Sequence, residues 1–280
     1  MTRGIQFPMF APQTEWVMPD GLKDLTGYKE IAIDLETNDP GLITSGSGSV
    51  VGRGHIAGIA VAVEGWSGYY PIQHENGGNI DKKLVFGWLQ EILNQENTTF
   101  IFHNAMYDVC WLRAAGLIIK GKIVDTMIAA SLVNENRFKF DLNSLAKEYV
   151  GIGKDENVLR IAAKDFGVDP KAEMWRMPAM YVGEYAERDA EVTLKLWQRL
   201  SIELHNEELM DIFNLETKLF PCLVDMRFKG VRVDLEHAAK LKKNLIVREN
   251  KILSKIKELT GIDVEIHAAR SIAKAFDKLK

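Results

Sequence analysis

The chain of 280 residues has little cysteine, no long apolar run and no excess of basic residues. Its two cysteines, Cys110 and Cys222, both lie in apolar helical patterns, which predicts buried free thiols in a reducing cytoplasm and excludes a disulfide framework. No apolar stretch approaches the roughly 20 residues that span a bilayer, and the amino terminus lacks a signal-peptide pattern. We therefore expect a cytoplasmic protein with no membrane partner.

The formal net charge is −4. Proteins that bind nucleic acid by electrostatics alone are usually basic, so this charge argues against tight, non-specific binding to a duplex. Any contact with nucleic acid has to be local, or has to depend on metal ions that neutralise phosphates. An enzyme that grips a few nucleotides at the end of a strand is compatible with this composition.

Apolar runs bounded by turn residues predict an α/β domain after an irregular arm of about 28 residues. The predicted strands cover residues 30–36, 55–63, 69–72, 98–102 and 118–124. The predicted helices cover residues 81–94 and 104–115, and most of residues 125–200. Strands that come first and then alternate with helices indicate a mixed β-sheet flanked by helices.

The pattern changes near residue 205. A helix over residues 214–228 is followed by the extended segment GVRVD and by a long amphipathic helix, which Gly261 ends as a C-terminal cap. This second region carries no catalytic-looking cluster. We therefore expect one domain over residues 1–205 and a helical extension over residues 206–280.

Carboxylates that are grouped in three segments are the strongest functional signal. The segments IAIDLET, FHNAMYD and YAERDAEVTL supply Asp34, Glu36, Asp108 and Asp189. The Asp-x-Glu pattern occurs four times, but Asp34/Glu36 alone directly follows a buried strand, where residues two apart share a face. Four converging acids repel one another unless divalent cations lie between them, and paired cations with carboxylate ligands are typical of phosphodiester cleavage.

The other two segments fit the same site. Asn104 is expected to N-cap a helix at the carboxyl end of a strand, with Asp108 on the same face of that helix. Tyr185 and Asp189 are four residues apart on another helix, so the phenol and the carboxylate point at one spot. Taken singly, Asp108 also fits a solvated acid in a first helical turn, and Tyr185 above Asp189 fits a surface pair.

Together the segments resemble the three exonuclease motifs of the DEDD superfamily in its tyrosine-bearing form. The motif residues correspond to Asp34, Glu36 and Thr37, to Asn104 and Asp108, and to Tyr185 and Asp189. The resemblance continues through DTMIAASLVNE and FDLNSLAKEYVG. The later segment FPCLVDMRFKGVRVD is similar to the opening of the polymerase region in phage-type family A (polymerase I-like) DNA polymerases.

This resemblance implies an RNase H-like fold and a proofreading 3′–5′ exonuclease that acts on single-stranded or frayed DNA 3′ ends. Two divalent cations, Mg²⁺ or Mn²⁺, would be held by Asp34, Glu36, Asp108 and Asp189, as the family implies. Tyr185 would orient the attacking water. Thr37 and Asn104 are candidates for holding the terminal nucleotide. His74 and Arg53 are loop residues that could approach the substrate, and both also fit solvated side chains, which are commoner at such positions.

Residues 206–280 would then be a truncated polymerase thumb. Because the family's palm motifs are absent from the sequence, we do not expect this chain to synthesise DNA. The expected partners are a polymerase region or replication proteins, in the host cytoplasm if a phage encodes the chain. Two alternatives stay open, namely a freestanding RNA exonuclease of the RNase D type and a non-catalytic scaffold that binds DNA or proteins.

Overall fold

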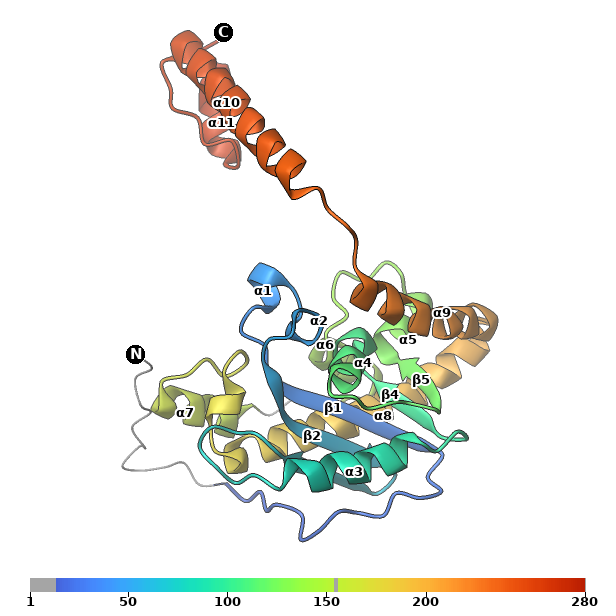
Figure 1. Cartoon of the computed structure of the whole chain (residues 1–280). Coiled ribbons are helices and arrows are strands. Elements are labelled where there is room, and N and C mark those ends of the chain that lie inside the picture. The colour runs from blue at the N-terminus through green and yellow to red at the C-terminus, as the bar shows by residue number, and fades with distance from the viewer. Residues whose placement is uncertain (1–13, 154–155, 280) are drawn as a thin grey trace. The chain divides into compact units, whose positions relative to one another are not determined.

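The computed structural model describes residues 14–153 and 156–279, so the first part of the predicted domain, residues 1–13, lies outside the described residues. The chain divides into two compact units, Met1–Phe228 and Lys229–Lys280 (Figure 1). Each unit is described by itself. No helix in the described ranges is long and apolar enough to cross a membrane.

A five-stranded mixed sheet forms the centre of the first unit. Its strands are β1 (Glu30–Asn38), β2 (His55–Val63), β3 (Trp66–Pro71), β4 (Thr99–Phe102) and β5 (Lys122–Asp125). They are ordered β3-β2-β1-β4-β5, with β1, β2 and β3 antiparallel and with β4 and β5 parallel to β1. The predicted mixed sheet is confirmed.

The last strand is shorter than the sequence suggested. It begins at Lys122, because the preceding residues pair with the end of a helix and not with the sheet. The Gln90 side chain accepts from the Ile118 N–H and donates to the Ile118 carbonyl, each at 2.9 Å, and the Lys120 N–H donates to Leu93. A period-2 apolar pattern cannot distinguish these two kinds of partner.

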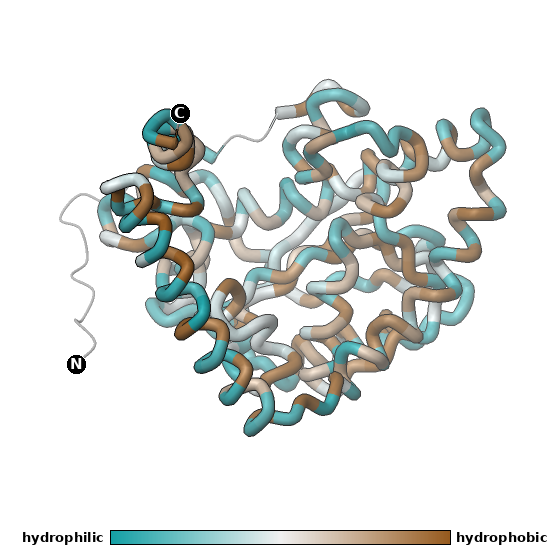
Figure 2. Tube along the Cα trace, turned by 90° about the horizontal axis from the view of Figure 1, so that it is seen from above, coloured by the Kyte–Doolittle hydropathy of each residue, from teal (hydrophilic) through white to brown (hydrophobic). Residues whose placement is uncertain are grey.

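Helices cover both faces of the sheet. They are α1 (Leu42–Ser45), α2 (Gly48–Val51), α3 (Lys82–Leu93), α4 (Ala105–Ala114), α5 (Thr126–Val133), α6 (Leu142–Tyr149), α7 (Asn157–Phe166), α8 (Gly183–Asn206) and α9 (Met210–Lys229). Two short 3₁₀ turns, η1 (Met174–Arg176) and η2 (Ala179–Tyr181), precede α8. Hydrophobic and hydrophilic residues alternate along the helices, as expected for helices that pack by one face (Figure 2).

Alternate residues of β1 separate two hydrophobic cores. Ile31, Ile33 and Leu35 pack with α3 and α4 on one face, whereas Ala32 packs with α5, α6 and α8 on the other. Helices α3 and α8 accordingly lie on opposite sides of the sheet (Figure 1). Since side chains alternate along a strand, Asp34 and Glu36 continue the face of Ala32, on which α8 lies.

Helix α8 crosses β1, β2 and β3. The apolar stripe that packs it on the sheet is buried and consists of Ala186, Ala190, Leu194 and Trp197. The facing strands present the small residues Ala32, Ala60 and Ala62. Small side chains on the sheet let the helix approach closely, which brings its other polar residues near the end of β1.

Residues 14–29 form an irregular arm that is tied to α8. The Trp16 Nε1 donates to the Glu187 carboxylate at 2.8 Å. A Cβ at Gly183 would come within 2.0 Å of the Trp16 ring, so only glycine lets this ring lie on the first turn of α8. This part of the arm is irregular as predicted, and it lies on the domain.

Helix α9 packs on the rest of the first unit through its buried residues Phe213, Phe220 and Val224. Cys222 lies on its other side and is exposed, so the prediction that both cysteines are buried is wrong for Cys222 and correct for Cys110. The boundary at residue 205 between the domain and the helical extension stays a prediction.

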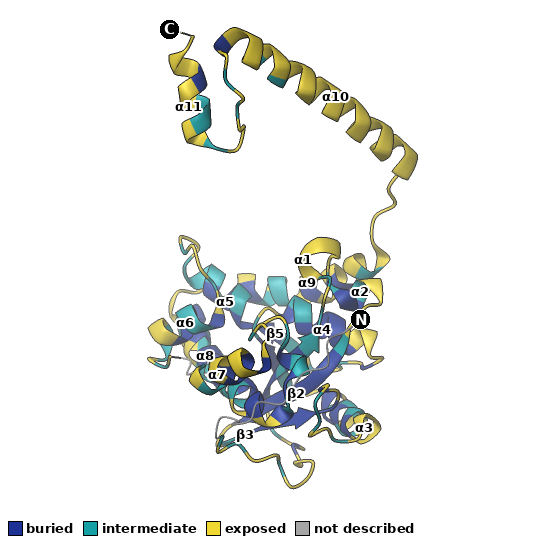
Figure 3. Ribbon diagram, turned by 90° about the vertical axis from the view of Figure 1, so that its left-hand side faces the viewer, coloured by how far each residue is buried: buried dark blue, intermediate teal, exposed yellow. Residues whose placement is uncertain are grey.

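The second unit contains α10 (Leu235–Thr260) and α11 (Ala269–Asp277). Asp234 caps α10 by accepting from the His237 N–H at 2.9 Å, and Gly261 ends the helix in a left-handed conformation as predicted. Helix α10 is almost entirely exposed within this unit, where Thr260 is its buried residue (Figure 3).

Candidate active site

The first two acids project from the carboxyl end of β1, on the face that α8 covers. In the register with β2, Asp34 lies opposite Ala60 and Glu36 lies opposite Gly58, and the pairing shifts directly after Glu36. Glu36 is only 6% exposed. Small partners on β2 leave room beside these carboxylates for groups from other elements.

Asp108 reaches the same strand from the first turn of α4. Its Oδ1 accepts a hydrogen bond from the Leu35 N–H at 3.0 Å, so this carboxylate is anchored between the two acids of β1. Burial raises the pKa of Asp108 well above its usual value, and the nearby charge of Asp34 raises it further. The Leu35 N–H acts in the opposite direction.

The third element, α8, contributes Tyr185 and the buried Asp189. Burial raises the pKa of Tyr185 well above its ordinary value, and a close Asp189 carboxylate adds to this. The charges of Glu36 and Asp34 raise the Tyr185 pKa as well. The phenol therefore lies within electrostatic reach of carboxylates from both β1 and α8.

Thr37 and Asn104 flank the acids. The Thr37 hydroxyl is hydrogen-bonded to the Tyr107 hydroxyl. Asn104 occupies the N-cap position of α4 with a φ of 63°, and its side chain makes no capping hydrogen bond. Asn104 is thus the N-cap residue as predicted, but its exposed side chain does not supply the capping hydrogen bond.

Comparison with known families decides which class of protein carries this arrangement. A family model described as 3′–5′ exonuclease matches residues 11–205, well over half of the chain. The chain belongs to this 3′–5′ exonuclease family. The exonuclease class inferred from the three motifs is confirmed, and the reading as a non-catalytic scaffold is set aside.

The relatives of the exonuclease agree with this family. The DNA-directed DNA polymerase of Pseudomonas phage M6 is 35% identical over 266 residues, which are 92% of this chain and 40% of that polymerase. The exonuclease thus spans well under half of the length of this relative. DNA polymerase I of Pseudomonas aeruginosa is 29% identical over 76% of this chain and 23% of its own length.

Solved structures support the fold of the exonuclease. NrnC of Brucella melitensis with bound Mg²⁺ superposes with a TM-score of 0.54 at 20% identity, over 76% of this chain and 92% of NrnC. At this identity the similarity concerns the fold alone. Together with the mixed sheet, it confirms the RNase H-like fold that the resemblance implied.

Asp125 is a residue of the exonuclease whose role the sequence analysis missed. Its buried carboxylate accepts from the backbone N–H groups of Asn104 at 3.0 Å, Ala105 at 2.8 Å and Met127 at 2.8 Å. One side chain at the end of β5 therefore caps both α4 and α5. An Asp directly before an apolar helical run is an N-cap signal that could have indicated the α5 cap, but not the α4 cap.

Tyr69 was also missed. Tyr69 is on β3, where it lies opposite Ala60 of β2 and is fully buried. Its hydroxyl donates to His74 Nε2 at 2.7 Å. The charges of Glu36 and Asp34 contribute to raising its pKa, after burial. Tyr69 therefore lies within electrostatic reach of the two acids of β1. A Cβ at Gly58 would come within 2.0 Å of the Tyr69 hydroxyl.

His74 is structural and does not approach a substrate. It is 4% exposed, and its Nδ1 donates to the Met177 carbonyl at 2.9 Å while its Nε2 accepts from Tyr69. Burial lowers the pKa of His74 to about 4. The suggestion that His74 contacts the substrate is wrong, because both ring nitrogens are engaged inside the domain.

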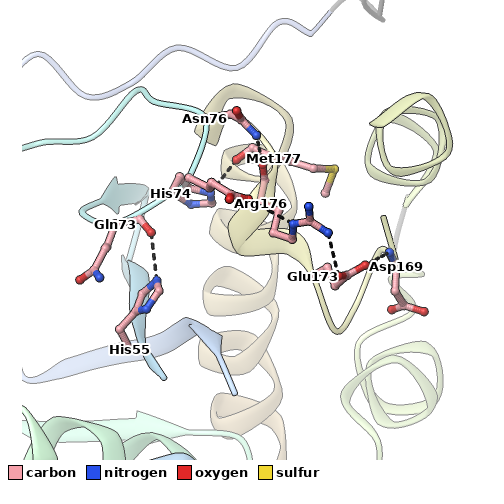
Figure 4. Close-up of polar contacts among 9 residues, drawn as sticks. His55, Gln73, His74, Asn76, Asp169, Glu173, Arg176 and Met177 are labelled. Atoms are coloured by element: carbon pink, nitrogen blue, oxygen red, sulfur yellow. Dashed lines mark hydrogen bonds and ion pairs between the residues drawn. The ribbon is translucent and has the colours of Figure 1, made fainter. Parts of the chain in front are cut away.

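The loop around His74 holds the turn that leads into α8 (Figure 4). The Asn76 side chain donates to the Arg176 carbonyl, and the Arg176 guanidinium bonds to Glu75 at 3.1 Å and Glu173 at 3.0 Å. The Glu75 N–H donates to the Trp175 carbonyl at 2.9 Å. These contacts fix the start of α8, the helix that carries Tyr185.

The donor chemistry of this site fits divalent cations. Its acids offer only oxygen ligands, which Mg²⁺ and Mn²⁺ prefer. In residues 14–153 and 156–279, no three His, Cys, Asp or Glu side chains are grouped closely enough to hold an ion. The four carboxylates are thus brought into one neighbourhood without forming a closed cage, and like charges favour such a separation.

Proposed function

We propose that this 3′–5′ exonuclease removes nucleotides from DNA 3′ ends by hydrolysis that depends on two divalent cations, Mg²⁺ or Mn²⁺, and that it proofreads for a family A polymerase. The observation that carries the proposal is the anchoring of Asp108 on Leu35, between Asp34 and Glu36. Acids from two elements that meet at one strand end, beside Tyr185 of a third, suit hydrolysis of a phosphodiester.

The resemblance to the DEDD exonucleases implies the roles of the acids. When bound, the cations would supply a Lewis acid and an activated water at phosphorus. Asp34, Glu36 and Asp189 would hold one of them, and Asp34 would share the second with Asp108 acting through water. Asp108 is held by Leu35 and buried, which suits a group that fixes geometry.

Tyr185 serves as a hydrogen-bond donor. Burial and the neighbouring carboxylates raise its pKa, so the phenol stays protonated at neutral pH. A protonated phenol cannot act as a general base, but it can orient a water molecule that lies between it and the acids.

Thr37 and Asn104 are proposed to hold the 3′-terminal nucleotide. The Asn104 side chain is exposed at the start of α4 and makes no capping hydrogen bond, whereas the Asp125 carboxylate accepts from the Asn104 N–H. Thr37 is oriented by Tyr107. Both residues can donate to or accept from a sugar hydroxyl or a base edge.

DNA is the proposed substrate because the phage relative that matches 92% of this chain is named a DNA-directed DNA polymerase. An RNA exonuclease of the RNase D type is the second candidate, since it shares the tyrosine-bearing motif set. No membrane partner is proposed. A polymerase region or other replication proteins are the proposed partners.

The test is digestion of matched DNA and RNA oligonucleotides that carry a 3′ label, with Mg²⁺ or Mn²⁺. We expect release of single nucleotides from single-stranded DNA, loss of activity with EDTA, and loss of activity in Asp34→Ala. Glu91→Ala, which removes an exposed acid of α3, is the matched control. Preference for RNA would favour the second candidate, and full activity of Asp34→Ala would overturn the site.

A further inference from the structure

Asp125 joins two junctions between a strand and a helix. It is the last residue of β5 and pairs with Phe102, the last residue of β4. Helix α5 starts directly after Asp125, and α4 starts three residues after Phe102. Because β4 and β5 run parallel to β1, both helices begin at the end of the sheet where β1 carries Asp34 and Glu36.

The two carboxylate oxygens of Asp125 share three backbone donors. Its Oδ1 accepts from the Asn104 N–H at 3.0 Å and from the Met127 N–H at 2.8 Å, and its Oδ2 accepts from the Ala105 N–H at 2.8 Å. Successive N–H groups converge on one anion where a left-handed residue turns the chain, and Asn104 has a φ of 63°. The buried carboxylate therefore holds Asn104 in a conformation that few residues other than glycine adopt.

Thr126, the next residue, fixes the same junction. Its hydroxyl donates to the Phe102 carbonyl at 3.1 Å. Since that hydroxyl has one proton, it accepts from the Nδ1 of His103, at 2.8 Å. Three successive residues between β4 and α4 are thus held by Asp125 and Thr126, which leaves the start of α4 little freedom to move.

The start of α4 carries two of the residues assigned to the reaction. Asn104 is exposed at the N-cap position, and Asp108 follows in the first turn. The ladder between β1 and β4 covers Glu30–Ala32, and beyond it the Asp108 carboxylate supplies the acceptor for the Leu35 N–H. A shift of the start of α4 would therefore move both Asn104 and Asp108 relative to the acids of β1.

We propose that Asp125 is a positioning residue of the exonuclease, which sets the places of Asn104 and Asp108 and does not itself contact the substrate. The proposal rests on the function proposed above, because it concerns the site of that reaction. Asp125 is buried, and both of its oxygens accept from the backbone of α4 and α5. A misplacement of about 1 Å can lower a rate by up to about 10²-fold, so loss of this contact is measurable.

Asp125→Asn is the least disruptive test. Its amide oxygen can replace Oδ1 and keep the bonds to Asn104 and Met127, but the amide nitrogen then faces the Ala105 N–H, so one bond to α4 is lost. We expect kcat to fall about tenfold and KM to rise, because Asp108 and Asn104 both shift. A mere loss of folded enzyme would lower the apparent kcat and leave KM unchanged.

Asp141→Asn is the matched control. Asp141 also caps a helix, α6, by accepting from the Ser144 N–H at 3.0 Å, but α6 carries none of the site residues. This variant should keep the wild-type kcat and KM. Asp125→Ser is a second test variant, because serine can still cap α5 but is too short to reach α4. It should fold and lower kcat more than Asp125→Asn, and wild-type kinetics in Asp125→Ser would overturn the proposal.

A double-mutant cycle shows whether Asp125 acts through Asp108. In the background of Asp108→Asn, the change Asp125→Asn should lower kcat by less than about twofold, and a full tenfold loss there overturns the proposal. Burial and the Asp34 charge are the main causes of the raised pKa of Asp108, and the Asp125 charge adds to them. Removal of that charge alone would favour the ionised form of Asp108, so a lower kcat reports a change of position.

Hydrogen exchange of the Leu35 amide, followed by NMR without metal, tests the position of Asp108 independently of catalysis. Since Asp108 accepts from this N–H, it should exchange about tenfold faster relative to the rest of β1 in Asp125→Asn, and at the wild-type relative rate in Asp141→Asn. Unchanged relative exchange in Asp125→Asn overturns the proposal. If the exchange responds as expected but the wild type hydrolyses neither DNA nor RNA, the proposed function fails and the positioning of Asp108 by Asp125 is supported.

Discussion

The carboxylate of Asp108 accepts a hydrogen bond from the backbone N–H of Leu35, with 3.0 Å between Oδ1 and N. This one contact joins α4 to β1 at the residue that separates Asp34 from Glu36. It brings a third carboxyl group to a strand end that already carries two. The arrangement therefore stores electrostatic repulsion where cations are proposed to bind.

Asp108→Asn separates this structural contact from the charge. The amide oxygen can still accept from Leu35, so the free energy of unfolding in urea should stay at or above that of wild type. The exonuclease rate should fall by roughly 10² or more, as for loss of an electrostatic group. Asp108→Ala leaves the buried Leu35 N–H unpaired and should cost about 1–3 kcal/mol of stability. Equal stability of the two variants would contradict this account.

Divalent cations should stabilise the fold. At a Mn²⁺ concentration of about 100 times Kd, a site that exists only in the folded state adds about 2.7 kcal/mol. We expect thermal melting to show a higher Tm with Mn²⁺ for wild type and a much smaller increase for Asp34→Asn. Without metal, Asp34→Asn should melt at or above wild type, because one of the repelling charges is gone. If Asp34→Asn melts well below wild type without metal, the carboxylates of the wild-type site do not repel one another enough to lower its stability.

Tyr185→Phe tests the role of the phenol. Since the raised pKa keeps Tyr185 protonated, its removal should lower kcat by about tenfold, less than the 10²–10⁴ typical of a lost general base. The pH dependence of kcat should keep its shape. Disappearance of a titrating limb from the pH–rate profile in this variant would show that the phenol itself ionises.

His74 makes stability depend on pH. Its folded-state pKa is lowered to about 4, against about 6.5 for an unfolded chain, so the unfolded state binds the proton more readily. The stabilisation is full above about pH 6.5 and is lost as the pH falls toward 4, by up to about 3 kcal/mol. His74→Gln removes this titration. Urea unfolding of both proteins from pH 7 to 4 should therefore show a steeper loss for wild type, and parallel curves would refute the assignment.

Two glycine substitutions should have opposite effects. Gly58→Ala places a methyl group 2.0 Å from the Tyr69 hydroxyl, and this overpacking should cost about 1–3 kcal/mol. Gly87→Ala lies on α3, where an added Cβ meets nothing within 4 Å, and should stabilise by about 0.5–1 kcal/mol. Urea unfolding measures both changes. A neutral Gly58→Ala would show that Tyr69 moves without cost.

Much of the fold follows from local patterns. The runs before Asp34 and His103 are apolar and short, so they indicated buried strands, and the stripe from Ala186 to Trp197 indicated a helix that packs on the sheet. The same patterns wrongly predicted that a strand begins at Ile118, whose backbone N–H and carbonyl are instead hydrogen-bonded to the Gln90 side chain. Periodicity records which side chains are apolar, but not which element they meet.

The sequence by itself determined the chemistry of this protein, because the types of residue in the three motifs and their order are local properties of the chain. It could also place Asp34 and Glu36 on one face, since alternation along a strand is a property of the backbone. Only the tertiary structure decided that Asp108 binds Leu35, that Asp125 caps two helices, and that His74 is buried behind Tyr69. The Asp108–Leu35 and Asp125–Ala105 contacts join residues distant in sequence, and such pairs are selected by packing and by the need to satisfy buried polar groups.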